Sequence, residues 1–441
     1  MNRFVMLKES WPFGLNIIGY ASANLGLGNT LRQFVTSFIE RGINICILDL
    51  DPGGDRSKFD NRFEYLTVKH ALELPYAVNL FIISALKLSD FALYPPKGLQ
   101  VEGRLNVAFP WWELTDIPKY WVDACQVFDA LVTGSEFVHN TFSTHVSDIP
   151  ILLTQHPVYI PNVVISNRAR FQLPENVFLV YTGFEPNSDT VRKNPFSAVE
   201  AFTRAFPCSF DCHLVIKVNN ANHLSGKNLE VFEKMLALIR SDQRIHLIEE
   251  CLPYEELLSL YASCDVFISL HRSEGFGLIP LEAMRLGKPV IATAWSGNMS
   301  YMNYLNSCLV DFKFVDTEDS YFYSKENLGI NTFWAEPDVN QAVAWLQKLF
   351  NDSHFRADRG LRAFVDSKQY HEQASKLQFV DELKAIWESR EFIPQRNREY
   401  FFNKALESRR RLDMSQVQWL FYKINLLFER HILWRFRKGE Q

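Results

Sequence analysis

Short runs of apolar residues alternate with longer stretches in which apolar and polar positions follow a helical period. Such short runs indicate buried strands, and the longer stretches indicate amphipathic helices. The first helix is predicted from about 29 to 41, because Asn29 and Thr30 are good cap residues and Gly42 fits the position after its last turn. The strands predicted in this part of the chain cover residues 15–20, 43–48, 78–84, 105–109 and 130–133. This alternation predicts a parallel sheet with helices on both faces.

The alternation pauses between residues 157 and 176, where three prolines occur and no period is visible. We interpret this stretch as a link between two domains. The pattern then restarts, with strands predicted at 177–182, 212–218, 245–249, 266–270 and 289–293 and helices near 194–206, 226–240 and 254–264. From 338 to about 390 it is helical. The expected fold class is therefore α/β: two Rossmann-like, doubly wound parallel-sheet domains (1–160 and 161–390) facing a cleft, and a helical tail (391–441).

The composition fits two buried cores and narrows the function classes. The 441 residues are 47% hydrophobic and 22% charged, and the formal net charge of −5 argues against a nucleic-acid binder that works by overall charge. The seven cysteines form no Cys-x-x-Cys pair, so neither a zinc site nor a disulfide framework is indicated, and free thiols in a reducing cytoplasm are expected. The longest apolar run, residues 76–86, is shorter than the roughly 20 residues that span a bilayer.

The stretch 271–284, HRSEGFGLIPLEAM, carries the most informative chemistry. Glu274 follows a predicted strand and is therefore expected at the cleft edge of the sheet, where ligands bind. Pro280 fits the first position of a helix expected at about 280–286, with Glu282 in its first turn. The amides of such a helix start attract phosphate, whereas a carboxylate there suits the hydroxyls of a ribose. For the two acids alone, a dipole-stabilising Glu282 and a solvated loop acid are the alternative.

These residues resemble the glutamate–seven residues–glutamate motif of retaining glycosyltransferases of family 4, which adopt the GT-B fold. The resemblance covers most of residues 14–350 and includes SEGFGLIPLEAMRLGKPVIAT and, upstream, RKNPFSAVEAFTRAF at 192–206. It implies that Glu274 contacts the donor sugar and that Glu282 binds the ribose of the nucleotide. It also implies that the backbone between them approaches the sugar and the diphosphate, at Gly275, Phe276, Gly277 and Leu278.

The resemblance further implies a basic pair on the diphosphate. Lys193 matches the lysine of that pair, but the usual place of the arginine, directly after Gly183, is occupied by Phe184. Arg192 or Lys217 could replace that arginine, since Lys217 ends a predicted strand, as a cleft residue should. For Arg192, a solvated position at a helix start is an open alternative.

Three segments of the first domain are further candidate site elements. The loop SANLGLG resembles the family's N-terminal glycine loop, so Gly26 and Gly28 are expected to face donor phosphate, although tight strand–helix turns also use glycine for packing. Where many family members carry a histidine toward the reaction centre, this chain has Trp112 and Glu113 in FPWWELTDIPKYW, and a tryptophan beside an acid suits sugar recognition. A core tryptophan and a surface glutamate are the alternative. Ser135 in GSEFV matches a recurring family element.

The resemblance implies a retaining hexosyltransferase that moves a sugar from a nucleotide-diphosphate donor to a glycan or lipid-linked acceptor, in surface polysaccharide assembly. Glu274, Lys193 and Glu113 are the expected catalytic residues, and Trp112 and Ser135 are expected on the acceptor side. Negative charge developing on the leaving diphosphate would be stabilised by lysines and helix-start amides, so no metal or other cofactor is expected. Nucleic acid is not expected as a partner.

Two other functions are compatible with parts of the sequence. A nicotinamide-dependent oxidoreductase would use the GLG turn with Asp49 about 20 residues further on, but Leu31 replaces the third glycine of that fingerprint. A catalytically inactive GT-B subunit that binds a partner is disfavoured by the presence of both motif glutamates and Lys193. Asp49-Leu-Asp51 is assigned no metal, because one such match occurs by chance, and His271 is expected to be structural.

The end of the chain differs from the rest in charge and pattern. Residues 401–441 hold nine Lys or Arg against four Asp or Glu. Apolar residues approximate a helical stripe through this tail: Trp419, Leu420, Ile424, Leu427, Phe428 and Leu433. A basic aromatic helix suits peripheral contact with the inner face of a membrane, and packing back on the first domain is the alternative.

Overall fold

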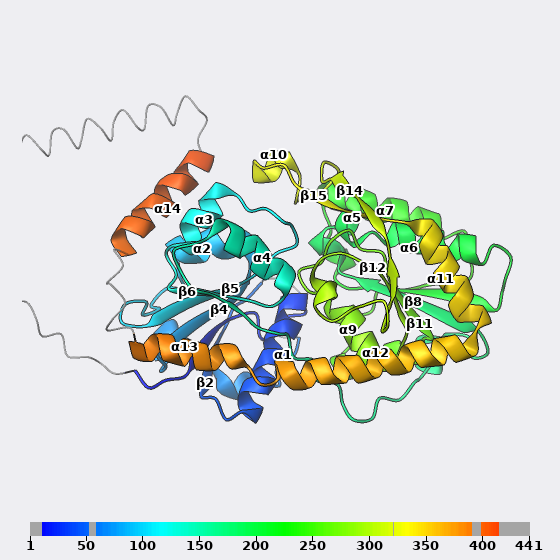
Figure 1. Ribbon diagram of the computed structural model, residues 1–441, viewed down its shortest axis with the longest axis horizontal. Coiled ribbons are helices and arrows are strands. Elements are labelled where there is room, and N and C mark those ends of the chain that lie inside the picture. The colour runs from blue at the N-terminus through cyan, green and yellow to red at the C-terminus, as the bar shows by residue number, and fades with distance from the viewer. Residues whose placement is uncertain (1–10, 53–58, 321, 390–397, 414–441) are drawn as a thin grey trace, which may run out of the picture.

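The two-domain α/β architecture predicted from the alternating pattern is confirmed. In a computed structural model of the chain, the described residues are 11–52, 59–320, 322–389 and 398–413. They form two parallel sheets that lie side by side along the long axis of the molecule, each with helices packed on it (Figure 1). The stretch between them, which we interpreted as a link, contains only one short 3₁₀ turn, Ala169–Phe171.

The first domain is built on a seven-stranded sheet with the order β3-β2-β1-β4-β5-β6-β7, in which every neighbouring pair is parallel. The strands are β1 (Leu15–Gly19), β2 (Ile45–Asp49), β3 (Thr67–Val68), β4 (Val78–Ser84), β5 (Leu105–Trp111), β6 (Ala130–Thr133) and β7 (Ile151–Leu153). The helices are α1 (Gly26–Glu40), α2 (Leu88–Leu93), α3 (Lys119–Cys125) and α4 (Glu136–His145). Successive strand residues point to opposite faces, so Ile17 of β1 packs in the core beneath α1, whereas Ile18 packs in the core beneath α2, α3 and α4.

A row of buried amides crosses the centre of this sheet. The register places Asn16, Asn79 and Asn106 side by side on β1, β4 and β5. Asn16 donates to Asn79 Oδ1 at 2.9 Å, and Asn79 donates to Asn106 Oδ1 at 2.9 Å. Because a slip of one residue would separate these buried groups from their partners, the row fixes the register of the three strands.

The second domain is built on a six-stranded parallel sheet with the order β10-β9-β8-β11-β12-β13. The strands are β8 (Phe178–Phe184), β9 (Cys212–Val218), β10 (Ile245–Ile248), β11 (Val266–Ser269), β12 (Val290–Thr293) and β13 (Cys308–Val310). The helices are α5 (Thr190–Lys193), α6 (Pro195–Ala205), α7 (Gly226–Ile239), α8 (Tyr254–Ser263), α9 (Leu278–Arg285) and α11 (Val339–Asn351). One face packs on α6, α7 and α11, and the other packs on α8 and α9 in a core that continues into the first domain.

Five further elements connect the two domains. An antiparallel hairpin of β14 (Phe312–Asp316) and β15 (Phe333–Pro337), with the short helix α10 (Lys325–Leu328) between its strands, follows β13. The long helix α12 (Ser353–Ala374) then leads to α13 (Gln378–Ser389), which lies against the first domain (Figure 1). The Phe379 ring lies 6.3 Å from Phe34 and 6.4 Å from Phe109. By these contacts, α13 packs on the first domain.

The described part of the tail packs on the first domain. Helix α14 (Arg398–Asp413) lies beside α2 and α3. Lys404 Nζ lies 3.2 Å from the buried Asp123 carboxylate, and Ser408 donates to the same carboxylate at 2.5 Å. The apolar stripe at 419–433 lies outside the described residues. Within the part of the chain that the structure describes, no helix is both long and apolar enough to cross a membrane.

Candidate functional site

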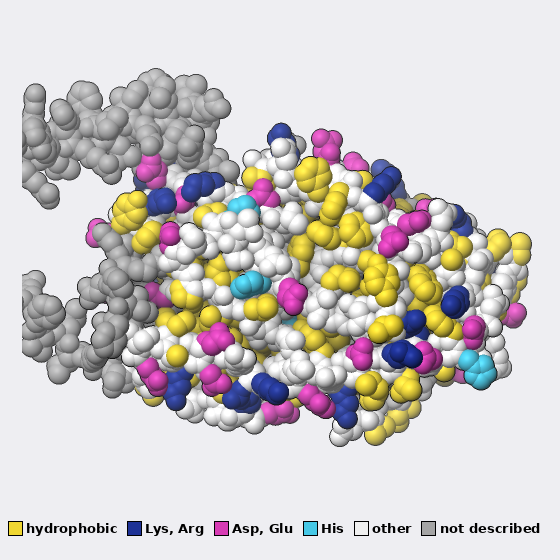
Figure 2. All heavy atoms as spheres, in the orientation of Figure 1, with side chains coloured by type: hydrophobic (Ala, Val, Ile, Leu, Met, Phe, Trp, Pro, Cys, Tyr) yellow, Lys and Arg dark blue, Asp and Glu magenta, His cyan; other side chains and the backbone are white. Residues whose placement is uncertain are grey.

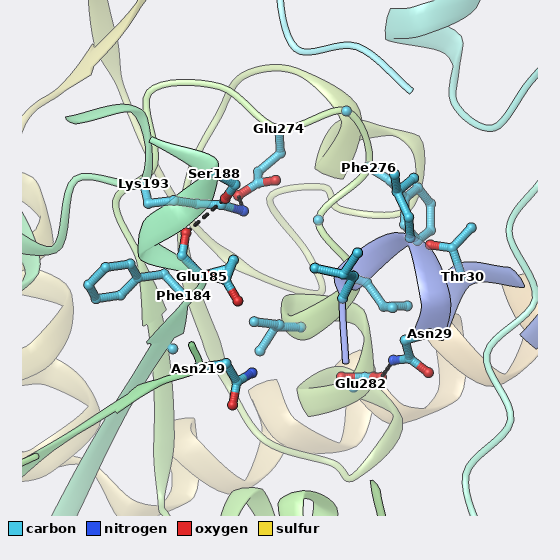
Figure 3. Close-up of a pocket in the computed structure, with 18 of the residues that line it drawn as sticks. Asn29, Thr30, Phe184, Glu185, Ser188, Lys193, Asn219, Glu274, Phe276 and Glu282 are labelled. Atoms are coloured by element: carbon cyan, nitrogen blue, oxygen red, sulfur yellow. Dashed lines mark hydrogen bonds and ion pairs between the residues drawn. The ribbon is translucent and has the colours of Figure 1, made fainter. Parts of the chain in front are cut away.

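A cavity of about 510 Å³ lies between the two domains. It is lined by the start of α1, the carboxyl ends of β8 and β9, and the chain from Glu274 to Glu282. Figure 3 shows Glu274 with Lys193 on one side of this cavity and Glu282 with Asn29 on another. The carboxyl ends of parallel strands are the usual ligand-binding edge of such folds, and here two such edges share one cavity.

Glu274 follows β11 and is held as a charged group among cations. Lys193 Nζ lies 2.5 Å from its Oε1, and Arg192 Nη1 lies 3.4 Å from its Oε2. Burial alone would raise the pKa of Glu274, but Lys193, Arg192 and His271 outweigh it and lower the pKa to about 2. Glu274 and Lys193, both expected as catalytic residues, are therefore in direct contact, and Glu274 is a carboxylate at any physiological pH.

Arg192 and Lys193 reach this carboxylate from the short helix α5. Asp189 caps α5 by accepting hydrogen bonds from the N–H groups of Val191 and Arg192. The Arg192 side chain is only 1% exposed and donates to the backbone oxygens of Ser273 and Ser188 at 2.7 and 2.9 Å. The solvated alternative for Arg192 is thus wrong, because its guanidinium is built into the wall of the cavity. Burial lowers the pKa of Lys193, while Glu274 favours its charged form.

Phe184 and Lys217 lie at the ends of two adjacent strands. Phe184 occupies the place of the family's arginine, and its side chain is buried in the core of the second domain at the edge of the cavity. Lys217 also lines the cavity, and it pairs with Gly183 in the register of β8 and β9. Its Nζ donates to the Val218 carbonyl at 2.7 Å and to Asn219 Oδ1 at 2.5 Å. Burial lowers the pKa of Lys217 to about 8.

The backbone from Gly275 to Leu278 forms the floor between the two glutamates. Gly277 has φ = +85° and is the N-cap of α9, a conformation that favours glycine. The helix begins at Leu278, two residues before the predicted start, so Pro280 is its third residue. The first N–H groups of a helix have no acceptor within the helix. Those of α9 begin at the cavity wall, where an anion would be attracted.

The first domain holds this floor in place from the other side. Ser135 caps α4 by accepting from the N–H of Val138, and its hydroxyl donates to the Gly275 carbonyl at 2.6 Å. A Cβ on Gly275 would lie 2.9 Å from the Trp112 carbonyl. The Phe276 ring stacks on His156 with centroids 4.8 Å apart. Ser135 therefore supports the glycine loop across the interface and does not itself line the cavity.

A substitution at Gly297 tests this packing. A Cβ at Gly297 would collide with the carbonyl of Gly275, so Gly297→Ala is expected to lower the free energy of unfolding by about 1–3 kcal/mol and to displace the loop. Urea unfolding measures the effect. In the matched control Gly26→Ala, the new Cβ meets nothing within 4 Å, and stability should not fall. Equal urea midpoints for Gly297→Ala and the wild-type protein would contradict the described contact.

Glu282 lies in α9 and is 1% exposed. Its Oε1 accepts from the Tyr254 hydroxyl at 2.9 Å and from the Asn29 side-chain amide at 3.1 Å. Burial raises the pKa of Glu282 to about 7, although these two hydrogen bonds act in the opposite direction. Because Asn29 comes from the first domain, its hydrogen bond crosses the cleft. Glu282 is the fifth residue of α9 and lies beyond its first turn, in which it was expected, so the alternative in which it only stabilises the helix dipole is wrong.

Gly26 and Gly28 turn out to differ in role. Helix α1 begins at Gly26, three residues before the predicted start, and Gly26 lines the cavity. Gly28 does not line it, and a Cβ there would collide with the carbonyl of Ala23. The position of Gly28 agrees with the alternative in which this glycine permits the tight strand–helix turn. Asp49 of the oxidoreductase alternative accepts from the Ser22 N–H at 3.2 Å and lies outside the cavity lining.

Trp112 and Glu113 lie in quite different surroundings. The Trp112 ring is 0% exposed, packs 4.6 Å from Trp121 and donates its indole N–H to the Asp116 carbonyl at 2.9 Å. The expected sugar-stacking role of Trp112 is therefore wrong, because no face of its ring is open to a ligand. Glu113 does line the cavity, where it accepts from the Tyr323 hydroxyl at 2.9 Å.

Tyr323, Tyr254 and Asn29 are cavity residues that were not singled out as site residues from the sequence. Their partners lie 210, 28 and 253 residues away along the chain, so no local pattern marks them. His271 is a satisfied structural histidine, as predicted, with Ser269 and Asn298 at 2.9 and 3.1 Å. Among the described residues there is no group of three or more His, Cys, Asp or Glu side chains that could hold a metal ion.

Comparisons with known proteins agree with this geometry. Residues 189–313 match the family described as Glycosyl transferases group 1, and this segment contains α5, Glu274 and Glu282. No curated protein matches the chain. The fold is similar to that of a sucrose-phosphate synthase from Thermosynechococcus elongatus, with a TM-score of 0.61 and 14% identity over 86% of this chain and 100% of that one.

Two other solved structures have the same arrangement of domains. HepE from Anabaena, solved with UDP and glucose, has a TM-score of 0.58 and 13% identity over 85% of this chain and 100% of that one. An α,α-trehalose-phosphate synthase (UDP-forming) from Burkholderia vietnamiensis has a TM-score of 0.59 and 12% identity over 85% of this chain and 98% of that one. At such identities the likeness concerns the fold. The chain thus has the GT-B fold, and residues 189–313 within it match the Glycosyl transferases group 1 family.

Proposed function

We propose that this protein is a retaining glycosyltransferase that takes a hexosyl group from a nucleotide-diphosphate sugar bound in the interdomain cavity. The observation that carries the proposal is the placement of two unlike carboxyl groups in one cavity. Glu274 is held charged by two cations, and Glu282 has its pKa raised to about 7 beside Tyr254 and Asn29. The start of α9 lies between them. This order fits the sugar, the diphosphate and the ribose of one donor.

Leaving-group stabilisation is the main catalytic task in this proposal. As the bond between the sugar C1 and the phosphate oxygen breaks, negative charge grows on the diphosphate. Lys193, Lys217 and the first amides of α9 are in place to stabilise that charge, so the proposal assigns no step to a metal. The acceptor hydroxyl attacks C1 from the same face, a new C1–O bond forms, and its proton passes to the departing phosphate oxygen.

The wider assignments are proposals of the same kind. The acceptor is a glycan or a lipid-linked glycan, bound on the first-domain side of the cavity, and the reaction belongs to surface polysaccharide assembly in the cytoplasm. Contact of residues 414–441 with the inner face of a membrane would bring the enzyme to a lipid-linked acceptor. UDP-sugars are the first donors to test, because two proteins of similar fold were solved with UDP or form it.

Thermal unfolding with a panel of ligands tests the donor assignment. The panel holds UDP, GDP, ADP, dTDP and their glucose, galactose, mannose and N-acetylglucosamine derivatives, in buffer with EDTA. One nucleoside diphosphate and its sugars are expected to stabilise the protein, by roughly 2.7 kcal/mol at a hundredfold excess over Kd. NAD at the same concentration is the control and should not stabilise it. Stabilisation by NAD alone would contradict the proposal.

A further inference from the structure

The β14–β15 hairpin is a part of the cavity wall that lies almost entirely outside the matched family segment, which ends at residue 313. Its strands pair from Phe312 opposite Pro337 to Asp316 opposite Phe333. The loop between them carries Phe322 and Tyr323 into the cavity lining. The hairpin therefore contributes to the site from outside the matched segment.

The hairpin is attached to both domains. In the second domain, the Ala335 N–H donates to the Arg272 carbonyl at 2.9 Å, and the Arg272 guanidinium lies 2.5 Å from Glu336. Toward the first domain, Tyr323 and Trp334 belong to the hydrophobic cluster that contains Trp112. Opposite residues of an antiparallel pair share a face, so Phe314 and Ala335 lie on one face and Val315 and Trp334 on the other.

The outer side of the hairpin is exposed and apolar. Phe314 and Phe333 are 54% and 51% exposed, and Figure 2 shows hydrophobic side chains gathered over this part of the surface. By contrast, Tyr323 is 4% exposed. Phe314 and Phe333 therefore face outward, whereas Tyr323 reaches the cavity. Phe333 can serve as a control position on the same hairpin.

Tyr323 organises the charged groups at the Glu274 end of the cavity. Its hydroxyl donates to Glu113 Oε2 at 2.9 Å, and its ring lies 5.3 Å from Trp112 and 5.5 Å from the Arg192 guanidinium carbon. Burial raises the pKa of Tyr323, so the phenol keeps the proton that it donates. The hydroxyl thus fixes one oxygen of the Glu113 carboxylate in the cavity wall.

Glu113 and Glu274 flank the same guanidinium. Arg192 Nη2 lies 3.8 Å from Glu113 Oε1, and Arg192 Nη1 lies 3.4 Å from Glu274 Oε2. One carboxylate comes from the first domain and the other from the second, and both line the cavity. Two fixed carboxylates at one end of a cavity suit a ligand with several hydroxyl groups, because each oxygen accepts a hydrogen bond.

We infer that the hairpin forms the sugar-selecting wall of the donor site, in which Tyr323 is a positioning residue that holds the Glu113 carboxylate toward the hydroxyls of the transferred sugar. The inference rests on the proposed function, since it assigns the Glu274 end of the cavity to the sugar. It predicts that Tyr323 and Glu113 matter for the sugar part of the donor and not for its nucleoside diphosphate part.

Isothermal titration calorimetry of Tyr323→Phe, with a nucleotide-sugar and with its nucleoside diphosphate, tests the inference. The phenylalanine keeps the ring and removes the hydroxyl. Its affinity for the nucleotide-sugar that stabilises the wild-type protein most should fall about tenfold, the cost of one hydrogen bond to a charged group. Its affinity for the corresponding nucleoside diphosphate should stay within about twofold of wild type. Phe333→Ser, on the outer side of the same hairpin, should change neither affinity.

A double-mutant cycle with Glu113→Gln distinguishes positioning from independent contact. If Tyr323 acts through Glu113, the variant Tyr323→Phe/Glu113→Gln should bind the nucleotide-sugar no more weakly than Glu113→Gln alone. If the losses of affinity in the two single variants add up in the double variant, the inference is overturned. It is also overturned if Tyr323→Phe loses the same affinity for the nucleotide-sugar and the nucleoside diphosphate, or loses affinity for neither. If the wild-type protein binds no nucleoside diphosphate at all, the proposed function itself fails, and the inference fails with it.

Discussion

Glu274→Gln is expected to lower sugar transfer by about 10²–10³-fold, the usual cost of removing a preorganised group at the reaction centre. The same change leaves Lys193 and Arg192 without the carboxylate that lies 2.5 and 3.4 Å from them. Breaking one partner of a buried ion pair costs about 3–5 kcal/mol, so the free variant should also be less stable than the wild-type protein. Turnover must therefore be measured at a temperature where both proteins are folded.

Ligand binding provides a second test of the Glu274→Gln variant. Without Glu274 the two cations are available to phosphate, so a nucleoside diphosphate should bind at least as tightly as to the wild-type protein and should restore stability. Titration calorimetry and thermal unfolding measure both effects. Glu200→Gln is a matched control, since Glu200 pairs with Arg204 at 2.8 Å on the exposed side of α6 and its replacement should affect neither turnover nor binding. Full turnover of Glu274→Gln would show that Glu274 is not a catalytic group.

Glu282→Gln is expected to raise the stability of the free protein while weakening donor binding. The folded pKa of Glu282 is about 7, above its usual value of 4.5, so the folded state holds this proton more tightly than the unfolded state. The free energy of unfolding therefore falls as the pH rises from about 4.5 to 7. Above pH 7 it stays at this lower value, because Glu282 is then ionised in both states. Glutamine does not ionise, so the variant should be more stable at pH 8 by about 1–3 kcal/mol and similar at pH 4.5.

The binding half of this prediction follows from the proposed contact with ribose. Replacing the carboxylate removes hydrogen bonds to a charged group, which should weaken nucleoside diphosphate binding about 10- to 100-fold at pH 8. A 2′,3′-dideoxynucleoside diphosphate lacks the hydroxyls and should bind the variant and the wild-type protein equally. Calorimetry at pH 8 and thermal unfolding from pH 4.5 to 8 provide the data. If Glu282→Gln loses the same affinity for the nucleoside diphosphate and for its 2′,3′-dideoxy analogue, the ribose assignment is contradicted.

Much of the fold follows from the sequence because the apolar runs are short and regularly spaced. The strand ends and the change at 157–176 were sufficient to predict two parallel sheets. Helix starts were less accurate: α1 begins at Gly26 and α9 at Leu278, each before its predicted first residue. Both starts lie at the cavity, where glycines permit the chain to turn directly from loop to helix. Asn29, which was expected to cap the helix, therefore lies inside α1 and donates across the cleft to Glu282.

The site was predictable where its chemistry is local in sequence. Glu274 and Glu282 lie eight residues apart, and the motif around them indicated a shared ligand. Trp112 was misjudged because a tryptophan beside an acid looks the same in the core and in a sugar site, and only packing against Trp121 decides between them. Tyr323 was missed because it lies in the hairpin that follows the second sheet, whereas its partners Glu113 and Trp112 belong to the first domain.

Release of nucleoside diphosphate from a nucleotide-sugar tests the central claim most directly, namely that this cavity binds and cleaves such a donor. Wild-type protein and Glu274→Gln are incubated with the panel of nucleotide-sugars in buffer with EDTA, and free nucleoside diphosphate is measured over time. We expect release from one donor by the wild-type protein and at least about 10²-fold slower release by the variant. Release at equal rates by both proteins, or none by folded wild-type protein from any nucleotide-sugar tested, would contradict that claim.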